Sequence, residues 1–148
     1  VIVSPDKDFM QLLSPHVSMF RPAYRGEGFD PVTQETFRAK YDLEPEQFID
    51  ILALMGDSAD NVPGVRGIGE KTAIKLISEY GSVENLLDHA SEVKGKRAQE
   101  GLANEADMAL LSKKLVTIKT DVELDLGWDD FACKSPDLGE IKQLFKDL

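Results

Sequence analysis

Residues 61–73 read Asn-Val-Pro-Gly-Val-Arg-Gly-Ile-Gly-Glu-Lys-Thr-Ala, and no other stretch says as much about the architecture. At its centre is the turn Gly67-Ile68-Gly69, and the small residue Ala73 follows it. Apolar residues at helical spacing precede this turn over about 44–55 and follow it over about 69–80. A Gly-apolar-Gly turn between two helices, with a small residue that permits close packing, predicts a helix–hairpin–helix.

Two other glycine-rich phosphate-binding motifs fit this stretch poorly. A P-loop requires a Gly-Lys pair directly before Ser or Thr, but Glu70 separates Gly69 from Lys71. A dinucleotide-binding fingerprint requires a third glycine where Thr72 stands, and a strand rather than a helix before it. An ordinary corner between two helices with a glycine hinge remains the alternative.

The backbone of a helix–hairpin–helix turn can hold a phosphate group. Glycine lets the chain turn tightly and approach an anion closely, and the N–H groups at the start of the following helix face that anion. Ile68 would point into the core, while Arg66, Lys71 and Lys75 would add positive charge. Such contacts hold a nucleic-acid backbone without reading its bases.

Two pairs of aspartates indicate a second kind of chemistry. Asp6 and Asp8 follow the β-branched run 1–3, at the carboxyl end of the strand that this run predicts. Asp57 and Asp60 are three residues apart in the turn before the glycines, which places them on one side of the chain. The first pair also suits a helix N-terminus and the second pair also suits Asx turns. Together the four carboxylates indicate oxygen-ligated Mg²⁺ or Mn²⁺ for phosphodiester hydrolysis.

The remaining elements predict an α/β fragment that is mostly helical. Short strands of a parallel sheet are expected over 1–3 and 16–20, and a loop is expected over 21–31 because it contains two prolines and two glycines. Further helices are expected in the following ranges: 8–13, 33–41, 44–55, 69–80, 83–88, 94–115 and 136–148. The strands at the start therefore precede a helix–hairpin–helix-like lobe.

The composition sets limits on the class of protein. With 148 residues, 42% hydrophobic and 30% charged, the chain is long enough for a globular domain. One cysteine, Cys133, excludes a disulfide framework and a cysteine-based zinc site. No apolar run approaches the length of a membrane span.

The formal net charge of −10 argues against a nucleic-acid partner only as a total. Residues 62–119 carry 9 basic and 8 acidic side chains, whereas residues 1–61 and 120–148 are net acidic. The middle of the chain, which contains the glycine-rich turn, is thus the only part that is not acidic. It also contains a basic cluster that is either a solvated face or a second phosphate contact, and the sequence leaves both open: Lys94, Lys96 and Arg97.

Three blocks of the sequence resemble one known family. Residues 1–12 read Val-Ile-Val-Ser-Pro-Asp-Lys-Asp-Phe-Met-Gln-Leu, residues 55–60 read Met-Gly-Asp-Ser-Ala-Asp directly before the glycine-rich stretch, and residues 80–87 read Tyr-Gly-Ser-Val-Glu-Asn-Leu-Leu. These blocks and their spacing closely resemble the 5′→3′ exonuclease domain of bacterial DNA polymerase I, one of the flap-endonuclease-like 5′ nucleases. The resemblance is strongest over 1–13 and 46–87.

The resemblance implies a metal site, and it implies a substrate. Asp6, Asp8, Asp57 and Asp60 match metal carboxylates of the family and would serve two Mg²⁺ or Mn²⁺ ions. Residues 64–73 would form a helix–three-turn–helix that holds duplex DNA, with K⁺ at the turn. The DNA-binding residues implied there and just beyond are Gly64, Arg66, Gly67, Gly69, Lys71, Thr72 and Lys75. Family members cut 5′ flaps and nicked ends near single-strand/duplex junctions during DNA replication and repair, in the bacterial cytoplasm at the nucleoid.

The chain departs from the family in two respects. Pro5 stands where a glycine is common, which stiffens the approach to Asp6 but removes no ligand. The first half of the family's domain, with further carboxylates, basic residues and a helical arch, is not in this sequence, so we expect the chain alone to bind DNA weakly and to cut poorly or not at all. A non-catalytic helix–hairpin–helix module that binds duplex DNA is the alternative function, and it would not require the four aspartates.

The resemblance also implies a division of the chain into three parts. Residues 1–55 would be the end of the α/β (PIN-like) nuclease core with the metal carboxylates, and residues 56–119 would be the DNA-binding lobe. Residues 120–148 would form an extended segment and a helix that lead to the covalently joined polymerase domains.

Overall fold

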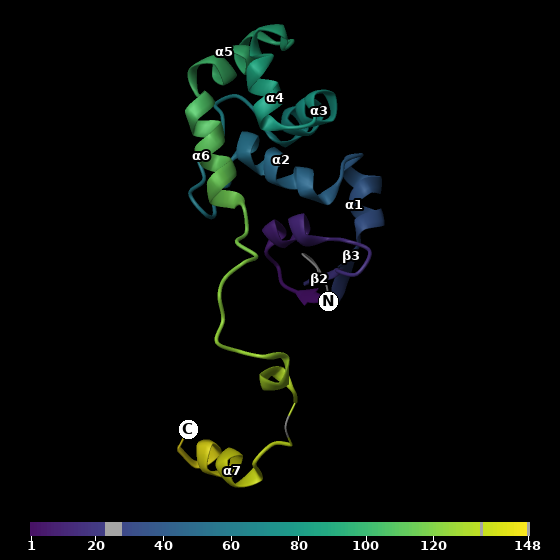
Figure 1. Ribbon diagram of the computed structural model, residues 1–148, viewed down its shortest axis with the longest axis vertical. Coiled ribbons are helices and arrows are strands. Elements are labelled where there is room, and N and C mark those ends of the chain that lie inside the picture. Colours follow the sequence, from purple (N-terminus) through teal and green to yellow (C-terminus); the bar gives the residue numbers. More distant parts are fainter. Residues whose placement is uncertain (23–27, 134, 148) are drawn as a thin grey trace. The chain divides into compact units, whose positions relative to one another are not determined.

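The computed structural model describes residues 1–22, 28–133 and 135–147 (Figure 1). It groups the chain into two compact units, Val1–Ile118 and Lys119–Leu148. The chain is mostly helical with a small sheet at the start, as the sequence predicts. The predicted boundary at residue 55 lies inside the first unit and stays a prediction.

The sheet of the first unit is mixed and has the order β1-β2-β3. Strand β1 (Ile2–Val3) is parallel to β2 (Met19–Pro22), and the 3-10 helix η1 (Lys7–Leu12) lies between them in the sequence. Strand β3 (Phe29–Val32) is antiparallel to β2. The predicted parallel strands are therefore present, with one antiparallel strand added.

The loop predicted over 21–31 is wrong at both ends. Arg21 lies in β2 and pairs with Asp30, and Pro22 pairs with Phe29. Residues 23–27 of the predicted loop lie outside the described residues. Antiparallel pairing accepts Pro31 because β3 is an edge strand, where a missing N–H costs little, and it accepts Pro22 because this last residue of β2 lies beyond the residues that pair with β1.

Helix α2 (Phe48–Met55) is the centre of the first unit. Ile51, Leu52, Ala53 and Leu54 are fully buried, so this helix has no solvent-facing side over that run. It packs against η1, against α3 (Glu70–Tyr80) and against α6 (Ala106–Val116). Through α2, the segment that carries Asp8 and the lobe that carries the glycine-rich turn share one core.

Local sequence signals explain the ends of several helices. Helix α1 (Gln34–Tyr41) begins at Thr33, which forms a capping box with Thr36. Ser82 caps α4 (Val83–Asp88), and α3 ends at Gly81, whose φ of +82° favours glycine.

Three predicted helices differ from those observed. The segments predicted over 8–13 and at the start of 44–55 are 3-10 turns, η1 and η2 (Pro45–Gln47). The single helix predicted over 94–115 is two helices, α5 (Lys96–Asn104) and α6, with a short 3-10 turn, η3 (Ala90–Glu92), before them. The break falls at Glu105, whose φ of −125° is not helical.

The second unit, 119–148, contains one 3-10 turn, η4 (Trp128–Phe131), and one helix, α7 (Leu138–Asp147). The final helix predicted from residue 136 thus begins two residues later. Across the parts of the chain that the structure describes, no helix combines the length and apolarity needed to cross a membrane.

Candidate functional site

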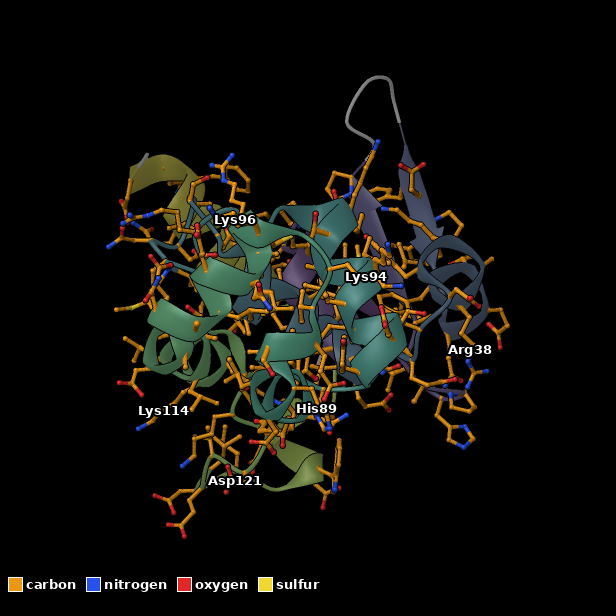
Figure 2. All side chains as sticks on the ribbon, turned by 90° about the horizontal axis from the view of Figure 1, so that it is seen from above. Arg38, His89, Lys94, Lys96, Lys114 and Asp121 are labelled. Carbon is orange, nitrogen blue, oxygen red and sulfur yellow. The ribbon has the colours of Figure 1, made fainter. Side chains whose placement is uncertain are left out.

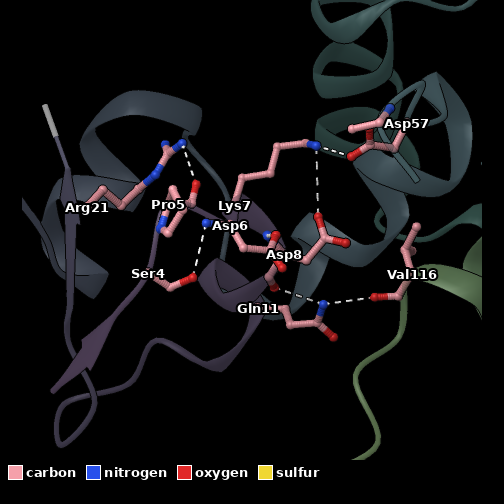
Figure 3. A network of polar contacts seen from close by, with 10 residues as sticks. Ser4, Pro5, Asp6, Lys7, Asp8, Gln11, Arg21, Asp57 and Val116 are labelled. Atoms are coloured by element: carbon pink, nitrogen blue, oxygen red, sulfur yellow. Dashed lines mark hydrogen bonds and ion pairs between the residues drawn. The ribbon is translucent and has the colours of Figure 1, made fainter. Parts of the chain in front are cut away.

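The segment after β1 places two of the predicted aspartates. The Asp6 carboxylate accepts a hydrogen bond from the backbone N–H of Asp8 at 2.9 Å, so Asp6 is the N-cap of η1. The Ser4 hydroxyl in turn accepts the N–H of Asp6 at 3.1 Å. The Asp8 side chain is then directed toward the loop that follows α2 (Figure 3).

The loop 57–62 places the other two aspartates. Two backbone hydrogen bonds close it, from Asp57 N–H to Val62 C=O at 2.9 Å and from Val62 N–H to Asp57 C=O at 2.7 Å. The Asp57 carboxylate also accepts the N–H of Ala59 at 2.8 Å, which is the predicted Asx turn. Asp57 is buried and Asp60 is exposed, so the loop presents one carboxylate from inside and one from the surface.

Three of the four predicted carboxylates meet. Asp8, Asp57 and Asp60 each offer an oxygen, and these oxygens lie within 4.8 Å of one another. Asp6 is not in this group, because its carboxylate is turned back onto η1. The Lys7 ammonium lies among the three: it donates a hydrogen bond to Asp57 and is 4.0 Å from Oδ1 of Asp8 (Figure 3).

The charges of this cluster shift one another's pKa values. Burial and then the nearby carboxylate of Asp6 raise the pKa of Asp8, because both disfavour a further negative charge. The hydrogen bond from Lys7 lowers the pKa of Asp57. Burial alone would lower the pKa of Lys7, but its hydrogen bond to Asp57 and the charge of Asp57 outweigh burial and raise it. The carboxylates of the cluster therefore carry more negative charge than the single ammonium of Lys7 neutralises.

The donor set fits a divalent cation. Oδ1 of Asp8 is buried and has no hydrogen-bond partner among the described residues, and a buried acceptor without a partner is costly. Carboxylate oxygens are the ligands that Mg²⁺ and Mn²⁺ prefer. The Lys7 ammonium shows that a cation is accommodated between Asp8 and Asp57.

One residue of the site has no signal in the sequence. The buried side chain of Gln11 donates hydrogen bonds to the backbone C=O of Asp8 and of Val116, both at 2.9 Å (Figure 3). It also accepts the N–H of Ile118 at 3.0 Å. It thereby ties η1, which carries Asp8, to the end of α6. A lone glutamine in an otherwise ordinary pattern does not reveal partners that lie more than a hundred residues away.

The three glycines of the turn have different surroundings. Gly64 has a φ of +63°, and a methyl group there would lie 2.8 Å from Cα of Gly56, so folding alone accounts for this glycine. Gly67 is exposed and has a φ of +88°, and the side chain of Arg97 lies where a methyl group on Gly67 would be. Gly69 has an extended φ of −101° and no atom within 4 Å of the position of a methyl group. Of these three glycines, Gly69 alone combines an exposed surface with an empty position for a methyl group.

The other residues predicted for this surface are exposed. Lys71, Thr72 and Lys75 lie on the first turns of α3, and none of them takes part in an ion pair within the described ranges. The Arg66 side chain is 85% exposed and pairs with Glu105 at 3.5 Å. The Glu105 carboxylate also accepts the backbone N–H of Arg66 at 2.7 Å.

The interior supports the turn from both sides. Ile68 is buried, as the sequence predicts, and Ala73 is fully buried in the close contact of α3 with its neighbours. The hydroxyl of Ser112, on α6, accepts the N–H of Gly64 at 3.0 Å. The turn is therefore held rigidly by α2, α3 and α6.

Comparisons with known proteins agree with this geometry. The family model described as "5'-3' exonuclease, C-terminal SAM fold" matches residues 43–139. DNA polymerase I of Bacillus caldotenax is 46% identical over 147 residues, which is 99% of this chain but 17% of that protein. The chain thus spans about a sixth of the length of this curated relative.

Two solved structures show the same fold. A complex of the bacteriophage T5 flap endonuclease with DNA and metal ions is 29% identical with a TM-score of 0.66, over 77% of this chain and 41% of that chain. The catalytic core of Rad2 in complex with DNA has a TM-score of 0.63 over 99% of this chain and 50% of that chain. At 17% identity, Rad2 is evidence for the fold alone.

Proposed function

Because this chain belongs to the family of 5′→3′ exonucleases, we propose that it supplies the duplex-binding lobe and part of the metal site of a structure-specific 5′ nuclease. The observation that carries this proposal is the meeting of Asp8, Asp57 and Asp60, which come from two segments about fifty residues apart. Binding of a phosphate backbone alone would not require three carboxylates at one point.

The carboxylate cluster would hold divalent cations in this function. We assign Asp8, Asp57 and Asp60 as ligands, and Asp6, which sits beside them, as a further ligand or as the group that orients η1. When bound, Mg²⁺ or Mn²⁺ activates water and stabilises the charge that develops on the phosphate. Two ions are what the family resemblance implies, and the T5 relative was solved with metal ions.

The glycine-rich turn and α3 would hold the DNA. Gly69 leaves the position of a side chain open, and exposed basic side chains follow it on α3, at Lys71 and Lys75, and precede it at Arg66. An anion there would also face the N-terminus of α3, which has no side-chain cap. Thr72 offers a hydroxyl on the same turn, and we place K⁺ at this turn on the family resemblance.

The wider role follows from the relatives. We propose that the substrate is duplex DNA with a 5′ flap or a nick, and that polymerase domains are joined to this chain in the full-length protein. Action at the bacterial nucleoid, in replication and repair, fits a relative of DNA polymerase I.

Asp57→Asn in the full-length protein tests the proposal. The amide keeps the acceptor for Ala59 but removes the charge, so we expect Mg²⁺-dependent flap cleavage to fall at least a hundredfold. Duplex affinity, measured in EDTA, should stay within about twofold because phosphate contacts lie elsewhere. Asp88→Asn, an exposed aspartate on α4, is the control and should cleave like the wild type.

The outcome distinguishes the two candidate functions. Cleavage that survives Asp57→Asn would remove this loop from the metal site. A full-length protein that binds duplex but shows no metal-dependent cleavage, in wild type or variant, would leave the non-catalytic DNA-binding module as the function.

A further inference from the structure

Arg97, on α5, lies across the glycine-rich turn although it is thirty residues away in the sequence. A methyl group on Gly67 would be 2.7 Å from Cγ and 2.8 Å from Nε of Arg97. The arginine side chain therefore fills the space that a side chain of Gly67 would occupy. Helix α5 is held in this position by Gly101, which packs against the backbone C=O of Arg66.

Arg66 and Arg97 line the same surface hollow. Its volume is about 210 Å³, and its lining residues are Arg66, Arg97, Glu100, Gly101, Asn104 and Glu105. The hollow thus lies directly beside the turn that we propose to hold DNA.

The two acidic side chains of the hollow are already paired. Glu105 binds Arg66 through its backbone N–H and its side chain, and Glu100 pairs with Lys96 at 3.8 Å. No carboxylate of the described residues forms an ion pair with Arg97. Arg97 is also exposed, so its guanidinium is accessible to an external anion.

We propose that Arg97 is a second phosphate contact of the duplex-binding surface, which reaches the nucleic-acid backbone from α5 beside Arg66 and over Gly67. The proposal rests on the proposed function of the turn and extends the surface beyond it. A guanidinium offers a planar fork of donors that matches a phosphate. Because the stem of Arg97 already lies on the turn, less side-chain entropy is lost on binding.

The three members of the basic cluster, Lys94, Lys96 and Arg97, differ in what surrounds them. Lys96 pairs with Glu100, and Lys94 is exposed and is not among the residues that line the hollow. Figure 2 labels both lysines. Arg97 lines the hollow and also lies against Gly67 of the turn. The φ of +88° already favours glycine at position 67, and room for the side chain of Arg97 is a second reason for it.

Duplex binding in EDTA across a range of salt concentrations tests the proposal without any cleavage. For Arg97→Ala we expect affinity for a short blunt duplex to fall roughly five- to tenfold, and the slope of log affinity against log salt to become shallower by about one. The duplex affinity of Arg97→Lys should lie between those of Arg97→Ala and the wild type, because lysine keeps the charge but lacks the planar fork of donors. Lys94→Ala is the control and should change neither quantity beyond error.

A double-mutant cycle tests the contact with Gly67. Gly67→Ala should weaken binding in the wild type and should weaken it less in the Arg97→Ala background, because the backbone strain at a φ of +88° is common to both backgrounds whereas the displacement of Arg97 is not. Equal losses in both backgrounds, or wild-type affinity and salt slope for Arg97→Ala, would overturn the proposal. If the wild-type chain binds no duplex at any salt concentration, the proposed function fails and this proposal fails with it.

Discussion

Two lysines of this molecule each lie between two carboxylates, and only one of these groups is a candidate site. Lys113, on α6, pairs with Asp50 on α2 and with Glu84 on α4, each at 2.7 Å. Lys7, in η1, pairs with Asp57 and lies 4.0 Å from Asp8. Each lysine thus faces two carboxylates, and the two groups differ in how completely their polar atoms are paired.

The group around Lys113 is closed. The Asp50 carboxylate also accepts the backbone N–H of Val83 at 3.0 Å, and the ammonium of Lys113 has two partners. The group around Lys7 is open, because Oδ1 of Asp8 has no hydrogen-bond partner in the described chain and Asp60 adds a third carboxylate. A group whose charges are all paired joins helices. A group with an unpaired carboxylate oxygen and an extra carboxylate lacks positive charge and can bind a further cation.

Lys113→Met should have the largest effect on stability. It removes the partner of Asp50, whose side chain is 9% exposed, and an unpaired charge at such a position is expected to cost about 3 kcal/mol of unfolding free energy. Urea unfolding at neutral pH measures this loss, and Mg²⁺ should not restore it. Lys114→Met, at an exposed neighbour on the same helix, is the control, and its free energy of unfolding should stay close to that of the wild type. A wild-type midpoint for Lys113→Met would show that the closed group does not join the helices.

Lys7→Met tests the open group by the same measurement. In EDTA the variant should lose about 2 kcal/mol, because Asp57 is buried and loses its pair while Asp8 and Asp60 still repel it. Adding Mn²⁺ should restore this loss and stabilise the variant more than the wild type, in which Lys7 competes for the same oxygens. Equal responses of the two proteins to Mn²⁺ would mean that no cation enters between Asp8 and Asp57.

Gln11→Ala tests the connection between the two regions. The change leaves two carbonyl groups and one N–H without their partner. All three lie in η1 or near the end of α6, where water can reach some of them. We therefore expect the free energy of unfolding to fall by about 1.5 kcal/mol. Gln11→Glu keeps the acceptor for Ile118 and places a charge against the carbonyl groups of Asp8 and Val116, so it should be at least as unstable. A variant with glutamate that is as stable as the wild type would contradict this arrangement.

Local signals made much of the helical part predictable. Thr33, Ser82 and Gly81 mark helix ends through caps that involve only neighbouring residues, and the sequence locates those ends correctly. The burial of Ile68 and Ala73 likewise follows from the short helix–turn–helix pattern. The signals for these features lie within short runs of neighbouring residues.

Long-range contacts account for what the sequence did not reveal. The β2–β3 pairing is not visible in a stretch with prolines at 22 and 31, because only the partner strand stabilises it. The Glu105 side chain finds its partner in the N–H of Arg66, and the role of Gln11 depends on Val116 and Ile118. For the same reason the spacing of the aspartates indicates a metal site but does not show that Asp8 rather than Asp6 meets Asp57 and Asp60.

The smallest predicted effect is the pH dependence of the closed group. The hydrogen bond from Lys113 lowers the pKa of Glu84 from its ordinary value of 4.5. A carboxylate with a lowered pKa in the folded state contributes stability that is present above its ordinary pKa and is lost as the pH falls through the lowered one. Because Glu84 is 55% exposed, we expect this contribution to be only about 0.5 kcal/mol at neutral pH.

Glu84→Gln measures that contribution as a difference. Its unfolding free energy should lie below that of the wild type at pH 7, and the two curves should converge below the lowered pKa of Glu84, where the wild-type side chain is also neutral. Glu79→Gln changes an exposed position on α3 that takes part in no ion pair of the described residues. Its curve of unfolding free energy against pH should run parallel to that of the wild type throughout. Curves that stay separated at low pH would show that Glu84 acts through packing rather than charge, and the group around Lys113 would then be a pair with Asp50 alone.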